Sequence, residues 1–216
     1  MNTAFRNLMS KNIALCAAIA LAGCGALPDK PQRSTLYDFG PGLTAQPAAP
    51  AAPTLPTIAL AELETNPRLD GTQIVYRLAY ADANELRPYG QSRWSMAPTQ
   101  LLRQRLRDAL SERRLVLNAD ESATIARTEG KAPDMLRVTL EEFSHYFAAP
   151  GSSVGLVRLR ATLIQATPGG DRVKGQKTFT VQRPAASADA PGGVKALAAA
   201  SDAAVADLVT WLDGIR

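Results

Sequence analysis

The fold is decided by a run of alternating side chains that begins with Met135-Leu-Arg-Val-Thr-Leu-Glu-Glu-Phe143. Apolar and polar residues alternate here with a period of two, which is typical of a β-strand with one buried face. The pattern recurs at residues 154–166 and again at 172–181, after the turn sequence Thr167-Pro-Gly-Gly-Asp171. These three stretches therefore predict an antiparallel meander.

More strands are expected on the N-terminal side of this meander. Short runs rich in β-branched, aromatic and aliphatic residues are found at 34–39, 58–63, 73–78, 86–94 and 114–117. We expect the strand at 86–94 to form a hairpin with the one at 73–78, with the turn near Pro88–Gly90. The strand at 34–39 is expected to dock on the main domain, and a free tether is the alternative.

Two segments show helical periodicity. Ser95 is a candidate cap, Pro98 suits a first turn, and leucines recur at helical spacing from Leu102 to Leu110. Residues 194–212 are rich in alanine and carry an apolar stripe, which predicts a second helix. The order of strands, helix, strands and helix predicts an α+β fold, with a mostly antiparallel sheet and two main helices packed on one face.

The N-terminus has the layout of a secretory signal. Arg6 and Lys11 precede a short apolar run at residues 13–21. At roughly 1.5 Å per residue this run covers about half of a hydrocarbon core, which is too short for a stable span. We therefore expect the chain to be exported rather than threaded through the membrane.

A lipobox follows the apolar run. It reads Leu21-Ala22-Gly23-Cys24, a branched aliphatic residue and two small residues before a cysteine. We predict that the signal peptidase recognises Leu21, Ala22 and Gly23, and that the Cys24 thiol carries the lipid. The alternative is an ordinary secreted protein cleaved at an Ala-x-Ala-like site. The other cysteine, Cys16, lies in the leader, so the mature chain would hold no internal disulfide.

The net charge and the residue after the lipobox indicate which partners and which cellular location to expect. The full chain has 24 basic and 20 acidic residues, a net charge of +4. Cleavage of the leader would remove Arg6 and Lys11, which leaves 22 basic residues and a net charge of +2. Such a balance offers no electrostatic case for binding nucleic acid. Gly25 stands where an aspartate would retain a lipoprotein in the inner membrane. We therefore expect a lipid anchor at the periplasmic face of the outer membrane.

A proline- and alanine-rich stretch separates the N-terminal strand from the rest of the chain. Five of the fifteen prolines lie between Pro41 and Pro56, a composition that favours extended polyproline II and cannot build a core. The expected organisation is a signal peptide at 1–23, a lipidated N-terminus with short strand and linker at 24–57, and an α+β domain at 58–216.

Residues that could carry chemistry are few. His145 is the only histidine, and we interpret it as a solvated or hydrogen-bonded residue at a strand end. Gly130-Lys131 lacks the other residues of a phosphate-binding loop. Glu141 and Glu142 are adjacent, so on a regular strand they would point to opposite faces. We therefore expect no enzyme activity, no cofactor and no metal centre.

Arginines and tryptophans are the remaining candidates. We interpret Trp94 and Trp211 as core anchors rather than ligand platforms. The first expected helix and the residues just after it carry five arginines: Arg103, Arg105, Arg107, Arg113 and Arg114. We interpret them as a solvated face. The alternative is that they contact anionic lipid headgroups or a partner.

Several motifs, taken in order, resemble a known family. They are the run Leu69-Asp-Gly-Thr-Gln-Ile-Val-Tyr-Arg77, the pair Arg93-Trp94, the helix start Leu101-Leu-Arg-Gln-Arg-Leu106 and the strand Leu136–Phe143. Together with the lipobox, they resemble the ABC-type transport auxiliary lipoproteins, whose best-known members are the paraquat-inducible and MCE-associated lipoproteins. The sequence departs from the family's Ala-Glu-Pro after the tryptophan, where it reads Ser95-Met-Ala-Pro98.

The resemblance implies a non-enzymatic component of an MCE-type phospholipid transport system, anchored to the outer membrane. Its implied partner is an MCE-domain protein, with the permease and the ATPase supplied by separate subunits, and the resemblance leaves open a direct contact with phospholipid. The membrane is contacted through acyl chains on Cys24. The alternative function is a lipoprotein chaperone or assembly factor for an outer-membrane barrel or the lipopolysaccharide machinery.

Overall fold

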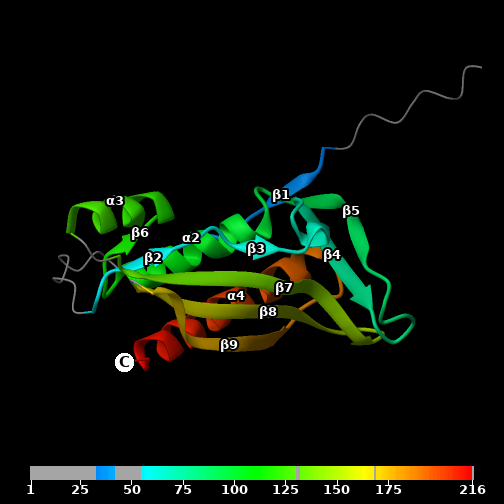
Figure 1. The fold of residues 1–216 in the computed structure, drawn as a ribbon. Coiled ribbons are helices and arrows are strands. Elements are labelled where there is room, and N and C mark those ends of the chain that lie inside the picture. The colour runs from blue at the N-terminus through cyan, green and yellow to red at the C-terminus, as the bar shows by residue number, and fades with distance from the viewer. Residues whose placement is uncertain (1–32, 42–54, 130–131, 168, 216) are drawn as a thin grey trace, which may run out of the picture. The chain divides into compact units, whose positions relative to one another are not determined.

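Strand β7 (Asp134–Ala149) organises the sheet because three strands share one of its edges. Its 16 residues leave room for β2 (Ile58–Leu60), β3 (Glu64–Thr65) and β4 (Gln73–Leu78) to pair with it in succession, each in parallel. Its other edge pairs antiparallel with β8 (Ser152–Thr167). This computed structural model describes residues 33–41, 55–129, 132–167 and 169–215 (Figure 1).

The remaining strands extend the sheet on both sides of β7. Strand β9 (Gly170–Pro184) pairs antiparallel with β8, which completes the predicted meander. On the other side, β5 (Arg87–Trp94) pairs antiparallel with β4, and β1 (Thr35–Tyr37) joins β5 in parallel. Strand β6 (Val116–Leu117) pairs with β2 in parallel. The docking of β1 on β5 confirms that the N-terminal strand belongs to the main domain.

The prediction of a mostly antiparallel sheet is wrong, because the described residues form a nine-stranded mixed sheet. Five of its eight strand pairings are parallel. Alternation along a strand reports which face is buried but carries no information on the direction of the neighbouring strand. The antiparallel pairs are those joined by short connections, whereas the parallel pairs join segments that are distant in the sequence.

Three α-helices and one 3-10 turn complete the described chain: η2 (Pro67–Leu69), α2 (Pro98–Ser111), α3 (Ala119–Glu129) and α4 (Ala190–Asp213). Figure 1 shows α4 running behind strands β7–β9, and α4 packs mainly against β8 and β9 and also contacts α2. No described helix combines the length and the apolar character needed to cross a bilayer.

Packing between α4 and the meander forms the main core. Leu136 and Leu140 of β7 and Leu159 of β8 are fully buried, and so are Leu197 and Leu208 of α4. Each fully buried leucine contributes about 2 kcal/mol to folding. The alternating residues of the meander and the stripe of α4 meet here, as their periodicities predict.

Strand β8 and helix α4 come into backbone contact at one glycine. A Cβ atom on Gly155 would lie 2.4 Å from the carbonyl carbon of Ala196 and 2.5 Å from the amide nitrogen of Leu197. Only a residue without a side chain allows an approach this close. Gly155 therefore fixes how near α4 lies to the sheet.

An aromatic cluster closes the end of the core near β1. The rings of Phe39 and Trp94 lie 5.6 Å apart edge to face, and Phe143 lies 5.6 Å from Trp94 and 6.0 Å from Phe39. This confirms Trp94 as a core anchor. Trp211 is only half-buried and packs on Phe179 at 5.8 Å.

Some element boundaries differ from the expectations. The residue that caps α2 is Ala97, without a side-chain hydrogen bond, so Ser95 is not its cap. Pro88 and Gly90 lie inside β5, and the chain between β4 and β5 turns at residues 79–86 instead. Helix α4 starts four residues before Val194 because the Asp189 carboxylate accepts a hydrogen bond from the Gly192 amide.

Candidate interaction surface

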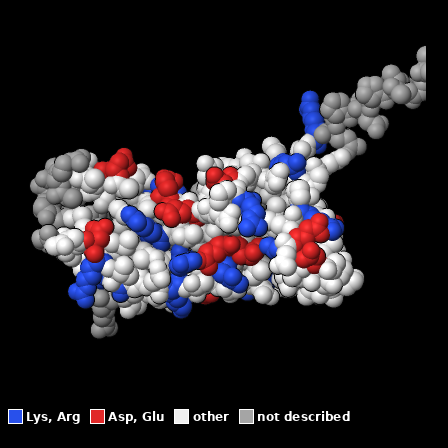
Figure 2. Space-filling model, turned by 45° about the vertical axis from the view of Figure 1, so that its right-hand side comes forward, with Lys and Arg blue, Asp and Glu red and all other residues white. Residues whose placement is uncertain are grey.

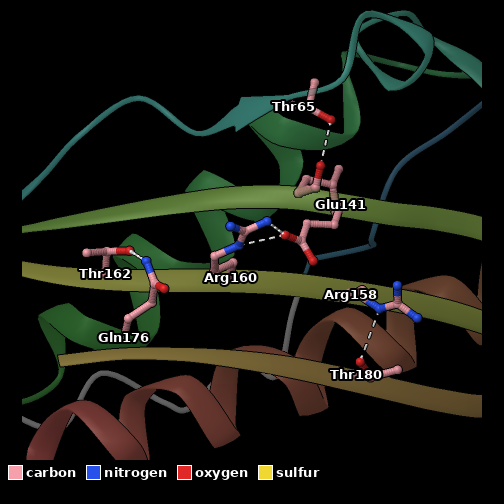
Figure 3. A network of polar contacts seen from close by, with 8 residues as sticks. Thr65, Glu141, Arg158, Arg160, Thr162, Gln176 and Thr180 are labelled. Atoms are coloured by element: carbon pink, nitrogen blue, oxygen red, sulfur yellow. Dashed lines mark hydrogen bonds and ion pairs between the residues drawn. The ribbon is translucent and has the colours of Figure 1, made fainter.

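Acidic and basic side chains are interleaved on the molecule, as Figure 2 shows for one of its faces. The face of β7–β9 opposite α4 carries such polar side chains (Figure 3). Gln176 Nε2 donates to Thr162 Oγ1 at 2.8 Å, and Arg158 Nε donates to Thr180 Oγ1 at 3.3 Å. Cross-strand contacts of this kind hold side chains in place on an uncovered sheet face.

Two neighbouring carboxylates lie on this same polar face. The register between β7 and β8 shifts between Leu140 and Glu142, which marks a β-bulge. The bulge places Glu141 and Glu142 on one side of the sheet, so the expectation that they point to opposite faces is wrong. Glu141 pairs with Arg160, and the Glu142 carboxylate lies 3.5 Å from the Arg77 guanidinium.

Charged side chains outside the bulge also lie on this polar face. Besides the two ion pairs of the bulge, the face carries the exposed side chains of Arg137 and Arg158. Neither has an acidic partner among the residues that the structure describes. The exposed Asp171 of β9, which is paired with Ala166, also lies on this face. The face is therefore polar and carries charges of both signs.

His145 lies on the opposite, helix-covered side and is fully buried. The Tyr89 hydroxyl lies 2.8 Å from His145 Nδ1, and the Ser153 hydroxyl lies 2.8 Å from Nε2. Because β7 continues to Ala149, His145 is inside the strand rather than at its end. The hydrogen-bonded interpretation of this residue is confirmed, and the solvated one is wrong.

Helix α4 seals this hydrogen-bonded chain. A Cβ atom on Gly193 would lie 2.4 Å from His145 Nδ1, so the first turn of α4 sits directly on the imidazole. Burial lowers the pKa of His145 to about 4, against the opposing effect of the Asp189 carboxylate. Burial likewise raises the pKa of Tyr89. The imidazole is therefore neutral at pH 7, and its position favours a structural role.

Acid is expected to destabilise the fold through His145. The unfolded chain binds a proton near pH 6.5, whereas the folded chain does so only near pH 4, so stability is lost as the pH falls between these values. The loss is at most about 1.4 kcal/mol per pH unit. Urea unfolding at pH 7 and pH 5 measures it, with His145→Gln as the control that lacks this contribution. Equal pH dependence of the two proteins would contradict the assignment.

The arginines of α2 are not a solvated face, which corrects the expectation. Arg103 pairs with Glu62 at 3.0 Å and donates to Asn118 Oδ1 at 2.9 Å. Arg107 donates to the carbonyl of Val116 at 3.1 Å. These side chains are half-buried because they bend over the helix to hold neighbouring segments.

Two further arginines, just after α2, contact the end of α4. Arg113 donates to Asp213 Oδ2 at 2.8 Å, and Arg114, whose side chain is 8% exposed, pairs with the other oxygen of that carboxylate. The two arginines tie the C-terminal end of α2 to that of α4. Arg114 is thus a buried structural residue, whereas the Arg113 side chain remains 57% exposed, as the interpretation of a solvated face expects.

Arg105 fastens the segment that follows β1. Its Nη2 donates to the carbonyls of Phe39 and Gly40, and its Nε lies 3.3 Å from Asp202 Oδ1 on α4. These contacts hold the chain immediately before the proline- and alanine-rich stretch. An open hollow of about 410 Å³ lies beside them, lined in part by Met96 and Leu101.

Arg105→Ala is expected to loosen residues 37–41 while leaving the meander intact. Hydrogen bonds from a charged donor contribute about 1.5–3 kcal/mol, so the amides of this segment should exchange about ten times faster or more. Hydrogen exchange read by mass spectrometry measures the effect. Gln104→Ala, at the exposed neighbouring position, is the matched control. Unchanged exchange in Arg105→Ala would show that the clamp is dispensable.

Helix α3 was not anticipated from the sequence. Its start is marked by the Asn118 amide, which donates to Glu121 Oε2 at 2.6 Å in a capping-box arrangement. The spacing Asn118-x-x-Glu121 was the available signal. The helix lacks a strong apolar stripe, and of its described side chains only Ser122 is buried.

The lipobox residues Leu21, Ala22, Gly23 and Cys24 lie outside the described residues, as does the stretch 42–54. Within the described ranges, no group of three or more histidine, cysteine, aspartate and glutamate side chains is arranged to hold a metal ion.

The sequence pattern of the ABC-type transport auxiliary lipoprotein components matches residues 37–209, from the last residue of β1 into α4. The chain belongs to this family. The apolar residues of the motifs that carried the resemblance lie in the core of the auxiliary-lipoprotein fold. Ile74 and Val75 of β4, Trp94 of β5 and Leu102 and Leu106 of α2 are buried.

Two solved structures share the fold of this auxiliary lipoprotein. A Xanthomonas campestris protein of the DUF330 family has a TM-score of 0.65 and 22% identity, over 82% of this chain and 94% of that one. A hypothetical protein from Chlamydia trachomatis has a TM-score of 0.51 and 8% identity, over 74% of this chain and 96% of that one. Among proteins with curated descriptions, none matches the chain.

Proposed function

We propose that this lipoprotein is a non-enzymatic auxiliary component of an MCE-type ABC phospholipid transport system. In this proposal, acyl chains on Cys24 anchor it at the periplasmic face of the outer membrane. The observation that carries the proposal is the family match over residues 37–209, on a chain whose N-terminus contains a complete lipobox. The permease, the ATPase and the lipid-conducting MCE subunit would be separate proteins.

The position of β1 supports a short tether. Strand β1 starts at Thr35, about ten residues after Cys24 in the sequence, and pairs with β5. Ten extended residues span at most about 35 Å. The proline- and alanine-rich stretch follows β1 and so does not separate the anchor from the domain. The tether would hold the docking surface close to the bilayer, where a weak interface suffices because its effective concentration is high.

The buried polar groups support a docking role rather than catalysis. The single histidine is covered by α4, and the arginines of α2 are engaged with other parts of the chain. The polar face of β7–β9 remains as an uncovered surface on which a partner can dock. Docking needs shape and charge complementarity rather than a reactive group, and this face offers charged and hydrogen-bonding side chains for it.

Affinity purification of the tagged full-length protein from its own host tests the proposal. We expect an MCE-domain protein to co-purify, accompanied by its permease and ATPase. Recovery of an outer-membrane barrel or of lipopolysaccharide-assembly proteins, without any MCE-domain protein, would favour the chaperone alternative and overturn the proposal. Neighbouring reading frames for an MCE protein, a permease and an ATPase would provide independent support.

A further inference from the structure

Strand β9 has one paired edge and one open edge. Its 15 residues pair with β8, and within the described ranges no strand pairs with its other side. Figure 1 shows β9 as the outermost strand of the meander. In an antiparallel edge strand, every second residue turns its N–H and C=O groups outward, which amounts to about seven residues here. This edge can template one further strand.

The regular part of this edge is long. The register between β8 and β9 shifts once, at Leu163/Ile164, and is then unbroken from Gly175 to Pro184. These ten residues exceed the roughly five to six of an average strand. A segment of ordinary strand length can therefore pair along the edge without meeting a bulge.

The edge carries charge of one sign. Its charged residues after Asp171 are all basic, and the next acidic residue is Asp189. Lys174 is paired with Asp134 at 2.9 Å, but Arg172, Lys177 and Arg183 have no acidic partner among the described residues. The Lys177 ammonium lies 5.1 Å above the Phe179 ring, at an exposed position.

We propose that the open edge of β9 binds an extended, acidic segment of the MCE-domain partner, which adds a strand to the sheet. The inference rests on the proposed function and names the surface and chemistry of its docking. Backbone groups of the segment would complete the hydrogen-bond ladder, and its carboxylates would meet Lys177 and Arg183. Two copies of this chain pairing through β9 would place like charges together, which disfavours self-association. Lipid headgroups cannot supply a backbone ladder.

The test measures hydrogen exchange at residues 170–184 in the purified mature lipoprotein, alone and in complex with the MCE-domain protein. We expect at least tenfold slower exchange of β9 amides in the complex. Charge reversal by Lys177→Glu or Arg183→Glu should weaken binding about tenfold each. Lys195→Glu makes the same change at an exposed position on α4 and should leave affinity unchanged. Thermal unfolding confirms that each variant is folded.

The outcomes separate this inference from the function on which it rests. A stable complex in which β9 exchanges as fast as in the free protein, with normal affinity of both charge-reversal variants, overturns the inference and leaves the proposed function standing. Absence of any complex with an MCE-domain protein overturns both. Protection of β9 that rises with protein concentration alone, or on addition of vesicles of phosphatidylglycerol alone, identifies a second copy or the bilayer as the occupant and overturns the acidic-segment proposal.

Discussion

Gly155→Ala is expected to lower the free energy of unfolding by about 3 kcal/mol or more. The added methyl group would lie 2.4–2.7 Å from backbone atoms of Ala196 and Leu197, distances at which something must move. Backbone atoms inside a helix cannot rotate away as a flexible side chain can. Helix α4 would therefore have to shift off β8, with a loss of packing along the shared core.

Urea unfolding followed by circular dichroism measures this loss. Gly90→Ala is the matched control, because a Cβ atom at Gly90, also in a strand, would meet nothing within 4 Å. We expect that control to be neutral or slightly stabilising, since alanine restricts the unfolded chain more than glycine does. Equal stability of Gly155→Ala and wild type would mean that α4 does not approach β8 this closely.

Cys24→Ala is expected to have the largest effect on location. Without the thiol no diacylglyceryl group can be attached, so the protein should leave the membrane fraction almost completely. Each buried CH₂ of an acyl chain contributes about 0.8 kcal/mol, and several chains exceed the two membrane-binding signals that stable anchoring needs. Loss of the anchor also removes the effective concentration that a weak docking interface requires. Outer-membrane integrity should decline accordingly.

Cell fractionation and mass spectrometry of the N-terminus check this prediction. Cys16→Ala makes the same chemical change inside the predicted leader and should leave processing, lipid attachment and location unchanged. An unmodified N-terminus on the native protein would contradict the lipobox interpretation. Full replacement of the native protein by the unanchored variant would refute the tethering argument instead.

The candidate surface was only partly predictable from the sequence. Alternation along residues 154–166 correctly indicated that Arg158 and Arg160 face away from the core, because side chains on a strand alternate with period two. The bulge that brings Glu141 beside Arg160 could not be foreseen. A bulge depends on the count of residues between two paired strands, so it is a property of the pair.

The arginines illustrate a similar limit. From the sequence, the five arginines on or just after α2 were interpreted as a solvated face. In the structure, the side chains of Arg105 and Arg114 are mostly buried against other segments. A long side chain can reach a carbonyl or carboxylate several residues away, and the sequence does not reveal which acceptor lies within reach. Helix α3 was not predicted because its sequence signal is a cap at its start rather than an apolar stripe.

What the sequence determined by itself was local periodicity: the meander, the apolar stripe of α4, the burial of Trp94 and the motifs of the family. The meander and the stripe depend on which residues lie two or about four positions apart, whereas the burial of Trp94 and the motifs depend on residue identity. The tertiary structure alone decided that β2, β3 and β4 share one edge of β7 in parallel, that Gly155 meets α4 and that no described strand pairs with the outer edge of β9. Such features require two distant segments to meet, and strand direction and neighbour are set by how the whole chain packs rather than by the residues of either segment.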